Sequence, residues 1–106
     1  LFVLPSLVDR NPLTLVEAMA TSTPVIATDY GAMPEIVGDA GFIVKAGDAD
    51  GLAERMIEIL KDTDLARSLG KKGSERHREH FSPDVVKERY FKAIDSVLGN
   101  SRVKRV

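Results

Sequence analysis

Two acidic residues near the start of the chain, Asp9 and Glu17, have the types and the spacing that could do chemistry. Asp9 falls in a polar turn after an apolar run, and Glu17 falls inside the helical pattern that follows. Open α/β sheets bind ligands at such strand–turn–helix junctions, where carboxylates commonly accept hydrogen bonds from ribose hydroxyls. The two acids therefore predict a site for a nucleotide or a sugar phosphate.

A strand and a helix must position these acids. The apolar run over residues 1–5 predicts a strand that is buried on both faces of a parallel sheet. Asn11 is typical of an N-cap and Pro12 of a first helical position. Together they predict a helix that runs to about Thr21 and is apolar almost all round.

The polar positions of this helix lie on one stripe. Thr14, Glu17 and Thr21 have the spacing of a single helix face, so Glu17 should have a hydrogen-bonding partner or face a wet cleft. The N–H groups of Leu13 and Thr14 are unpaired within a helix that starts here, so they can hold a phosphate. Two plainer alternatives are a solvent-facing Glu17 and threonines that bond back to their own helix.

A second strand over residues 23–28 leads into a turn that we expect to open onto the same crevice. Gly31 offers the backbone freedom that a close approach to a ligand needs, and Ala32 follows it. Glu35 lies where a short helix can begin. The plainer alternatives are a simple turn glycine at Gly31, an acid at Glu35 that favours a helix start, and an ordinary turn residue at Asp9.

The rest of the chain predicts one short strand at residues 41–44 and then three helices. The first follows Asp48 as its N-cap, the second covers about 64–79, and the third opens at Ser82. The apolar faces of the first and third are predicted to be Leu52, Met56, Ile57 and Leu60, and Val86, Tyr90, Ala93, Ile94 and Val97. We therefore predict an α/β fold, half of a doubly wound, Rossmann-like parallel sheet of about three strands with flanking helices and a helical C-terminal tail.

The composition excludes several function classes. The 106 residues carry a net charge of −1, which gives no electrostatic reason to expect nucleic acid as a partner. Without cysteine there is no thiol nucleophile or thiolate metal site, and His77 and His80 in a charged tail do not predict a zinc site. No apolar run approaches the roughly 20 residues that span a bilayer, so we expect a cytoplasmic protein.

Two features of the chain ends complete this picture. Because Leu1 opens directly into a strand, we expect the chain to be a piece of a longer one. The basic residues near the other end alternate with acids and predict a solvated face, with weak contact to the cytoplasmic face of a membrane as the alternative. They are Lys71, Lys72, Arg76, Arg78, Arg102, Lys104 and Arg105.

A resemblance to a known family is carried by two stretches, PSLVDRNPLTLVEAMATSTPVIATDYGAMPEIV and GFIVKAGDADGLAERM. Together they resemble the C-terminal half-domain of retaining GT-B glycosyltransferases of the glycogen-synthase and mannosyltransferase type, the group 1 glycosyl transferases. The resemblance spans about residues 1–60. It implies that residues 1–80 are the C-terminal part of a nucleotide-sugar-binding domain and that 81–106 form a terminal helix and a frayed tail.

The resemblance also implies roles for single residues. Glu17 matches the acid that binds the ribose hydroxyls of the donor, and Asp9 matches the acid beside the donor sugar, the catalytic position. The other implied donor-binding residues are Arg10, Asn11, Leu13, Thr14, Gly31, Ala32 and Glu35. Asp9 is shorter than the family's usual Glu, and glycine is frequent in the family where this chain has Arg10, Pro12, Ser22 and Ala32.

The function implied is transfer of a sugar from a nucleotide-sugar donor to a glycan, lipid or small-molecule acceptor, with retention and without a metal or cofactor. The family's basic phosphate-binding residues and its N-terminal acceptor-binding domain would lie upstream of Leu1, so we expect these 106 residues alone to be inactive. The alternatives are another GT-B enzyme, such as a sugar-nucleotide epimerase or a phosphorylase, and a non-catalytic nucleotide-binding or interaction module.

Overall fold

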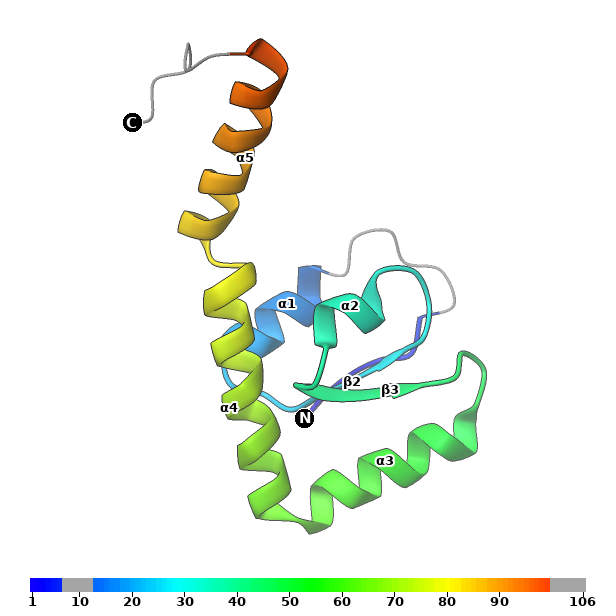
Figure 1. Ribbon diagram of the computed structural model, residues 1–106. Coiled ribbons are helices and arrows are strands. Elements are labelled where there is room, and N and C mark those ends of the chain that lie inside the picture. The colour runs from blue at the N-terminus through cyan, green and yellow to red at the C-terminus, as the bar shows by residue number, and fades with distance from the viewer. Residues whose placement is uncertain (7–12, 100–106) are drawn as a thin grey trace.

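The computed structural model describes residues 1–6 and 13–99, and in these residues three parallel strands alternate with helices (Figure 1). The elements are β1 (Phe2–Leu4), α1 (Leu13–Ala20), β2 (Val25–Thr28), α2 (Met33–Val37), β3 (Gly41–Val44), α3 (Ala49–Lys61), α4 (Thr63–His80) and α5 (Pro83–Leu98). The predicted α/β class, with its parallel strands, flanking helices and helical C-terminal segment, is confirmed.

The sheet has the order β1-β2-β3, with Phe2 paired to Val25 and Val25 paired to Gly41. Every residue of the central strand β2 is buried. The strand predicted within residues 1–5 is present as β1, but the prediction that it is buried on both faces is wrong, because β1 is only half-buried. Within the described residues β1 has a neighbouring strand on one side alone, which leaves its other edge uncovered.

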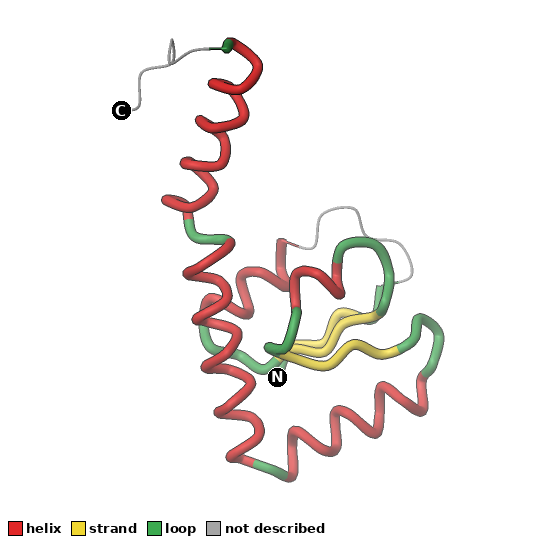
Figure 2. Tube along the Cα trace, in the orientation of Figure 1, coloured by secondary structure: helices red, strands yellow, loops and turns green. Residues whose placement is uncertain are grey.

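Helices cover both faces of the sheet. Figure 2 shows α1 and α2 over one face and α3 along the other. Alternate residues of β2 point to opposite faces, as a strand requires. Val25 and Ala27 pack with Leu15 and Met19 of α1, whereas Ile26 packs with Ile59 of α3. The core is therefore two apolar layers separated by the sheet.

Helix α4 crosses the amino-terminal edge of the sheet and contacts both layers. Its Leu69 belongs to the α3 layer, and its Gly70 lies against the segment that ends α1, where a Cβ on Gly70 would come within 2.2 Å of the Ser22 carbonyl oxygen. Ser22 has a φ of 59°, in the left-handed region. Glycine would adopt this φ without strain, whereas a serine here is strained.

Side-chain caps set the helix starts. The Oδ1 atom of Asp48 accepts a hydrogen bond from the Gly51 N–H at 2.9 Å, and Ser82 Oγ accepts one from Val85 N–H at 3.4 Å, as the sequence predicted. The predicted face of α3 is partly wrong. Ile59 is the residue that is buried, while Ile57 is half exposed and Leu60 is 69% exposed. The face toward the sheet carries Leu52, Met56 and Ile59, and residues 57 and 60 are each one helical step, about 100°, further round.

Helix α5 corrects a second prediction. The sequence favours a core position for its apolar stripe, with docking against another domain of a complete enzyme as the alternative. None of its described residues is buried and Tyr90 is 68% exposed, so the core position is wrong within the described residues. Figure 1 shows the reason, since α5 continues beyond α4 and away from the sheet. Among the described residues, no helix is long and apolar enough to cross a membrane.

Candidate functional site

The predicted site residues that the structure describes lie toward one edge of the sheet. Helices that follow parallel strands begin at the carboxyl edge, and this is where α1 and the turn before α2 start. Six of the predicted residues are described, and all six are exposed: Leu13, Thr14, Glu17, Gly31, Ala32 and Glu35. Three others, Asp9, Arg10 and Asn11, fall outside the described residues.

Helix α1 presents Glu17 to solvent because the opposite side of the helix is anchored in the core. Leu15 and Met19 are fully buried, whereas the side chain of Glu17 is exposed and makes no hydrogen bond or ion pair to another described residue. The helix is less buried than predicted, since Leu13 is more than half exposed. Among the described residues Glu17 therefore has neither the predicted partner nor a cleft around it, which agrees with the plainer alternative of a solvent-facing acid, and its contact with a ligand stays a prediction.

The hydroxyl of Thr21, the third residue of the predicted stripe, is already hydrogen-bonded within the chain. Its Oγ1 donates a hydrogen bond to the Ala18 carbonyl at 2.9 Å and lies 3.0 Å from the Thr23 hydroxyl. The plainer interpretation of this threonine, a bond back to its own helix, is therefore correct. This hydrogen bond lies at the end of α1. Thr14 and Glu17 are then the polar residues of the stripe that remain available to a ligand.

The turn before α2 needs its glycine. Gly31 has a φ of 58°, and the Met33 N–H donates to the Tyr30 carbonyl at 3.2 Å across this turn. A residue with a Cβ would be strained there, which agrees with the plainer interpretation of Gly31 as a turn glycine and leaves its contact with a ligand a prediction. Met33 and Val37 are fully buried and fix α2 on the sheet, while Ala32 and Glu35 stay exposed.

Two polar side chains at the end of β2 position neighbouring segments, and the sequence analysis missed both. The buried hydroxyl of Thr28 donates a 2.6 Å hydrogen bond to the carbonyl of Ser6, the last described residue before Asp9. The carboxylate of Asp29 accepts a 2.8 Å hydrogen bond from the Ala46 N–H, after β3. A polar pair that ends an apolar strand was the available signal, but strand ends are commonly polar.

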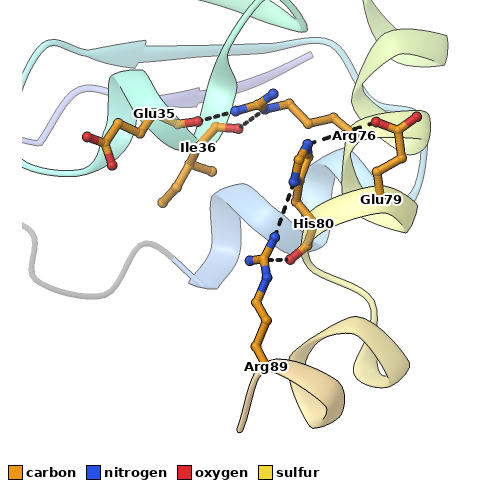
Figure 3. Close-up of polar contacts among 6 residues, drawn as sticks. All are labelled: Glu35, Ile36, Arg76, Glu79, His80 and Arg89. Atoms are coloured by element: carbon orange, nitrogen blue, oxygen red, sulfur yellow. Dashed lines mark hydrogen bonds and ion pairs between the residues drawn. The ribbon is translucent and has the colours of Figure 1, made fainter. Parts of the chain in front are cut away.

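Arg76 is the third residue that sequence reasoning missed. It was grouped with a solvated basic face, yet it is half-buried and bonded to α2. Its Nε donates a 2.7 Å hydrogen bond to the Ile36 carbonyl, and its Nη2 donates to the Glu35 carbonyl (Figure 3). The sequence distance of 40 residues between Ile36 and Arg76 hides this contact from any local pattern.

A cavity of about 220 Å³ lies at the carboxyl ends of the strands on the α3 side of the sheet. It is lined mainly by apolar atoms and includes Pro5, Thr28, Val44 and Leu52. None of the six described site residues lines it, because these six belong to α1, to α2 and to the turn before α2, on the other face of the sheet. In the described part of the chain, no group of three or more His, Asp or Glu residues is placed to hold a metal ion.

Comparisons with known proteins agree on one family. The model of the family described as Glycosyl transferases group 1 matches residues 1–76. The chain is 36% identical over 92 residues to N-acetyl-alpha-D-glucosaminyl L-malate synthase of Bacillus anthracis, covering 85% of this chain and 24% of that protein. It is 40% identical over 90 residues to phosphatidyl-myo-inositol mannosyltransferase of Mycolicibacterium smegmatis, covering 82% of this chain and 23% of that protein.

A solved structure shares the fold. Sucrose-phosphate synthase from Thermosynechococcus elongatus superposes with a TM-score of 0.83 at 33% sequence identity, over 92% of this chain and 25% of that one. The chain therefore spans about a quarter of the length of the proteins that it matches.

Proposed function

The chain belongs to the group 1 glycosyl transferases, and from that membership we propose that it forms part of the donor-binding domain of a retaining glycosyltransferase. The donor would be a nucleotide sugar, and the acceptor a glycan, a lipid or a small molecule. One relative is named as a mannosyltransferase and another as a synthase, which favours sugar transfer over epimerisation, phosphorolysis or a purely binding role.

The observation that carries this proposal is the exposed carboxylate of Glu17, one turn into a helix that starts at the carboxyl edge of a parallel sheet. The first turn of α1 offers N–H groups and the positive end of a helix dipole, which suit a diphosphate. A carboxylate one turn further along suits the ribose hydroxyls of the same nucleotide. Glu17 is the only residue of the described stripe that carries a charge.

The chemistry would be transfer of the sugar: the bond between its anomeric carbon and the diphosphate oxygen breaks, a bond to an acceptor hydroxyl oxygen forms, and the hydroxyl proton passes to the departing diphosphate. The negative charge that develops on the diphosphate would be held by main-chain N–H groups and basic side chains. The N–H groups would come from the start of α1 and from Arg10 and Asn11, and the basic side chains from upstream sequence. Asp9 would lie beside the donor sugar. No metal or cofactor enters this scheme. The acceptor site would come from the N-terminal domain of the full-length protein.

The remaining parts of the proposal concern the setting of the enzyme. We propose that it works in the cytoplasm, with at most a weak contact to the membrane surface through its basic residues, and that it has no nucleic-acid partner. Because the net charge is −1, such a membrane contact would be local and easily screened by salt.

The assignment of Glu17 to the ribose hydroxyls is tested by a double-mutant-type cycle that compares protein variants and ligands. Binding of UDP, GDP and ADP to the full-length protein is measured by calorimetry. Glu17→Gln removes the charge and keeps the shape of the side chain. A hydrogen bond to a charged group contributes about 1.5–3 kcal/mol, so the tightest diphosphate should bind roughly 10- to 100-fold more weakly. Glu54→Gln, at an exposed glutamate of α3, is the matched control and should change nothing.

The 2′,3′-dideoxy form of the same diphosphate completes the cycle. Wild-type protein should discriminate against it, and the Glu17→Gln variant should lose most of that discrimination, because the hydroxyls and the carboxylate are the two partners. An equal preference in both proteins would show that Glu17 does not bind the ribose. Sugar transfer by the isolated 106 residues would contradict the assignment of this chain as only a part of the donor site.

A further inference from the structure

We propose that Arg76 is a positioning residue for the turn that carries Gly31, Ala32 and Glu35, holding α2 by the end that lies away from the ligand. This inference rests on the proposed function, because the turn is taken to contact the donor. Arg76 itself would touch neither donor nor acceptor. It lies on α4, which crosses the opposite edge of the sheet.

The first support is the geometry of the guanidinium. Its Nε bonds the Ile36 carbonyl at 2.7 Å and its Nη2 bonds the Glu35 carbonyl, two of the carbonyls that the last turn of α2 leaves without helical partners. A cation at the C-terminal end of a helix is also favoured by the helix dipole. We call these two hydrogen bonds the clamp. Figure 3 shows the carboxylate of Glu35 pointing away from Arg76, so the clamp holds the backbone of α2 and leaves the Glu35 side chain exposed.

The second support is the glycine that makes room for the clamp. Gly38 ends α2 with a φ of 54°, and its N–H donates to the Pro34 carbonyl at 3.0 Å. A Cβ built on Gly38 would lie 2.6 Å from the guanidinium carbon of Arg76. The guanidinium therefore lies directly on this glycine, and a side chain at position 38 would push the guanidinium out of this place.

The third support is that α2 is too short to hold its shape by helical hydrogen bonds alone. It has five residues, far below the roughly 12–15 at which an isolated helix becomes even marginally stable. Its N-cap residue, Ala32, makes no side-chain cap hydrogen bond. Met33, Ile36 and Val37 pack α2 against the core by apolar contacts, and Arg76 adds side-chain hydrogen bonds from α4.

The surroundings of Arg76 provide a matched control. A cavity of about 220 Å³ is shared by Glu35, Arg76, His80 and Arg89. Arg89, from α5, donates to the His80 carbonyl at 3.1 Å and lies 3.3 Å from its Nδ1, so it braces α4 rather than α2 (Figure 3). A change at Arg89 alters the charge of the same cavity without touching the clamp.

The experiment combines hydrogen exchange and nucleotide binding on the full-length protein, at a temperature where every variant is more than about 99% folded. Arg76→Gln removes the charge and the forked donors, Arg76→Lys keeps the charge and one donor site, and Arg89→Gln is the control. The exchange probes are the amides of Ile36 and Gly38, which bond within α2 and its cap. The binding probe is whichever of UDP, GDP and ADP the wild-type protein binds most tightly.

We expect Arg76→Gln to speed exchange at these amides and to weaken diphosphate binding, each on the order of tenfold, since two charge-assisted hydrogen bonds are lost. Arg76→Lys should recover part of both effects, and Arg89→Gln should leave both within about twofold. A variant that only loosens the fold elsewhere, Ile59→Val in the α3 layer, should not weaken binding while it stays folded.

Three results would overturn part of this reasoning. Unchanged exchange at Ile36 and Gly38 in Arg76→Gln would show that Arg76 does not hold α2. Faster exchange with unchanged diphosphate affinity would show that the held turn does not serve the ligand. A wild-type protein that binds none of the three diphosphates would instead overturn the proposed function, and the exchange data would still decide whether Arg76 fixes the turn.

Discussion

The close approach of α4 to the end of α1 predicts opposite effects for the same substitution at two neighbouring glycines. Gly70 and Gly73 are both buried in α4, and alanine is preferred over glycine in a helix interior by about 1 kcal/mol. A Cβ on Gly70 would lie 2.2 Å from the Ser22 carbonyl oxygen, whereas a Cβ on Gly73 would make ordinary contacts with Met19, the nearest at 3.6 Å.

The magnitude follows from how far Ser22 would have to move. Ordinary contacts between a carbon and a carbonyl oxygen are about 3.3 Å or longer, so the carbonyl would have to retreat by about 1 Å. It is not free to do so, because the Ser22 N–H bonds the Met19 carbonyl at 3.1 Å and the Thr23 N–H bonds the Ala18 carbonyl at 3.1 Å. Overpacking of this kind costs about 1–3 kcal/mol.

We therefore expect Gly70→Ala to lower the free energy of unfolding by up to about 2 kcal/mol, after the gain in helix propensity, and Gly73→Ala to raise it by about 0.5–1 kcal/mol. Urea unfolding of the chain, followed by circular dichroism, measures both. With a slope of about 1–1.5 kcal/mol per molar urea, the two midpoints should differ by roughly 0.3–3 M, with the Gly73→Ala midpoint the higher. Equal stabilisation by the two alanines would refute the contact between α4 and Ser22.

Two further predictions concern residues that hold the site's framework. Ser22→Gly should raise the free energy of unfolding by about 0.5–1 kcal/mol in the same assay, because it relieves a left-handed φ of 59°. The control is Ser68→Gly, at an exposed position of α4, which should lower the free energy of unfolding. Thr28→Val should cost about 1–2 kcal/mol by removing the donor to the Ser6 carbonyl, and Thr28→Ser, which keeps the hydroxyl, should cost less. A valine variant as stable as the serine variant would show that this hydrogen bond contributes nothing.

Much of the fold could be predicted from the sequence because its signals are local. The apolar run at residues 41–44 is the strand Gly41–Val44, and Asp48 and Ser82 cap helices where their side-chain chemistry places them. The backbone need for glycine at Gly31 is likewise a local property of one turn. Periods and caps act over a few residues, so a single sequence displays them directly.

The errors came from contacts between distant residues. Nothing in the helix period says whether Ile57 or Ile59 faces the sheet, because both lie on an apolar side of α3 and the packing of the helix decides. The apolar stripe with Tyr90 predicted a core helix, but burial also needs a partner, and α5 lies away from the sheet. For the site, Thr28 and Arg76 act on carbonyls 22 and 40 residues away, which local patterns do not encode.

The bond between Arg76 and α2 has a consequence for the order in which the chain folds. A five-residue helix does not persist alone, and one of its attachments arrives on an element that begins 26 residues after it ends. Closing so long a loop has an entropic cost, and this cost precedes any stabilisation from the contact between Arg76 and α2. Helix α2 should therefore complete its structure after α4 has docked, so that changes at Arg76 speed unfolding more than they slow folding.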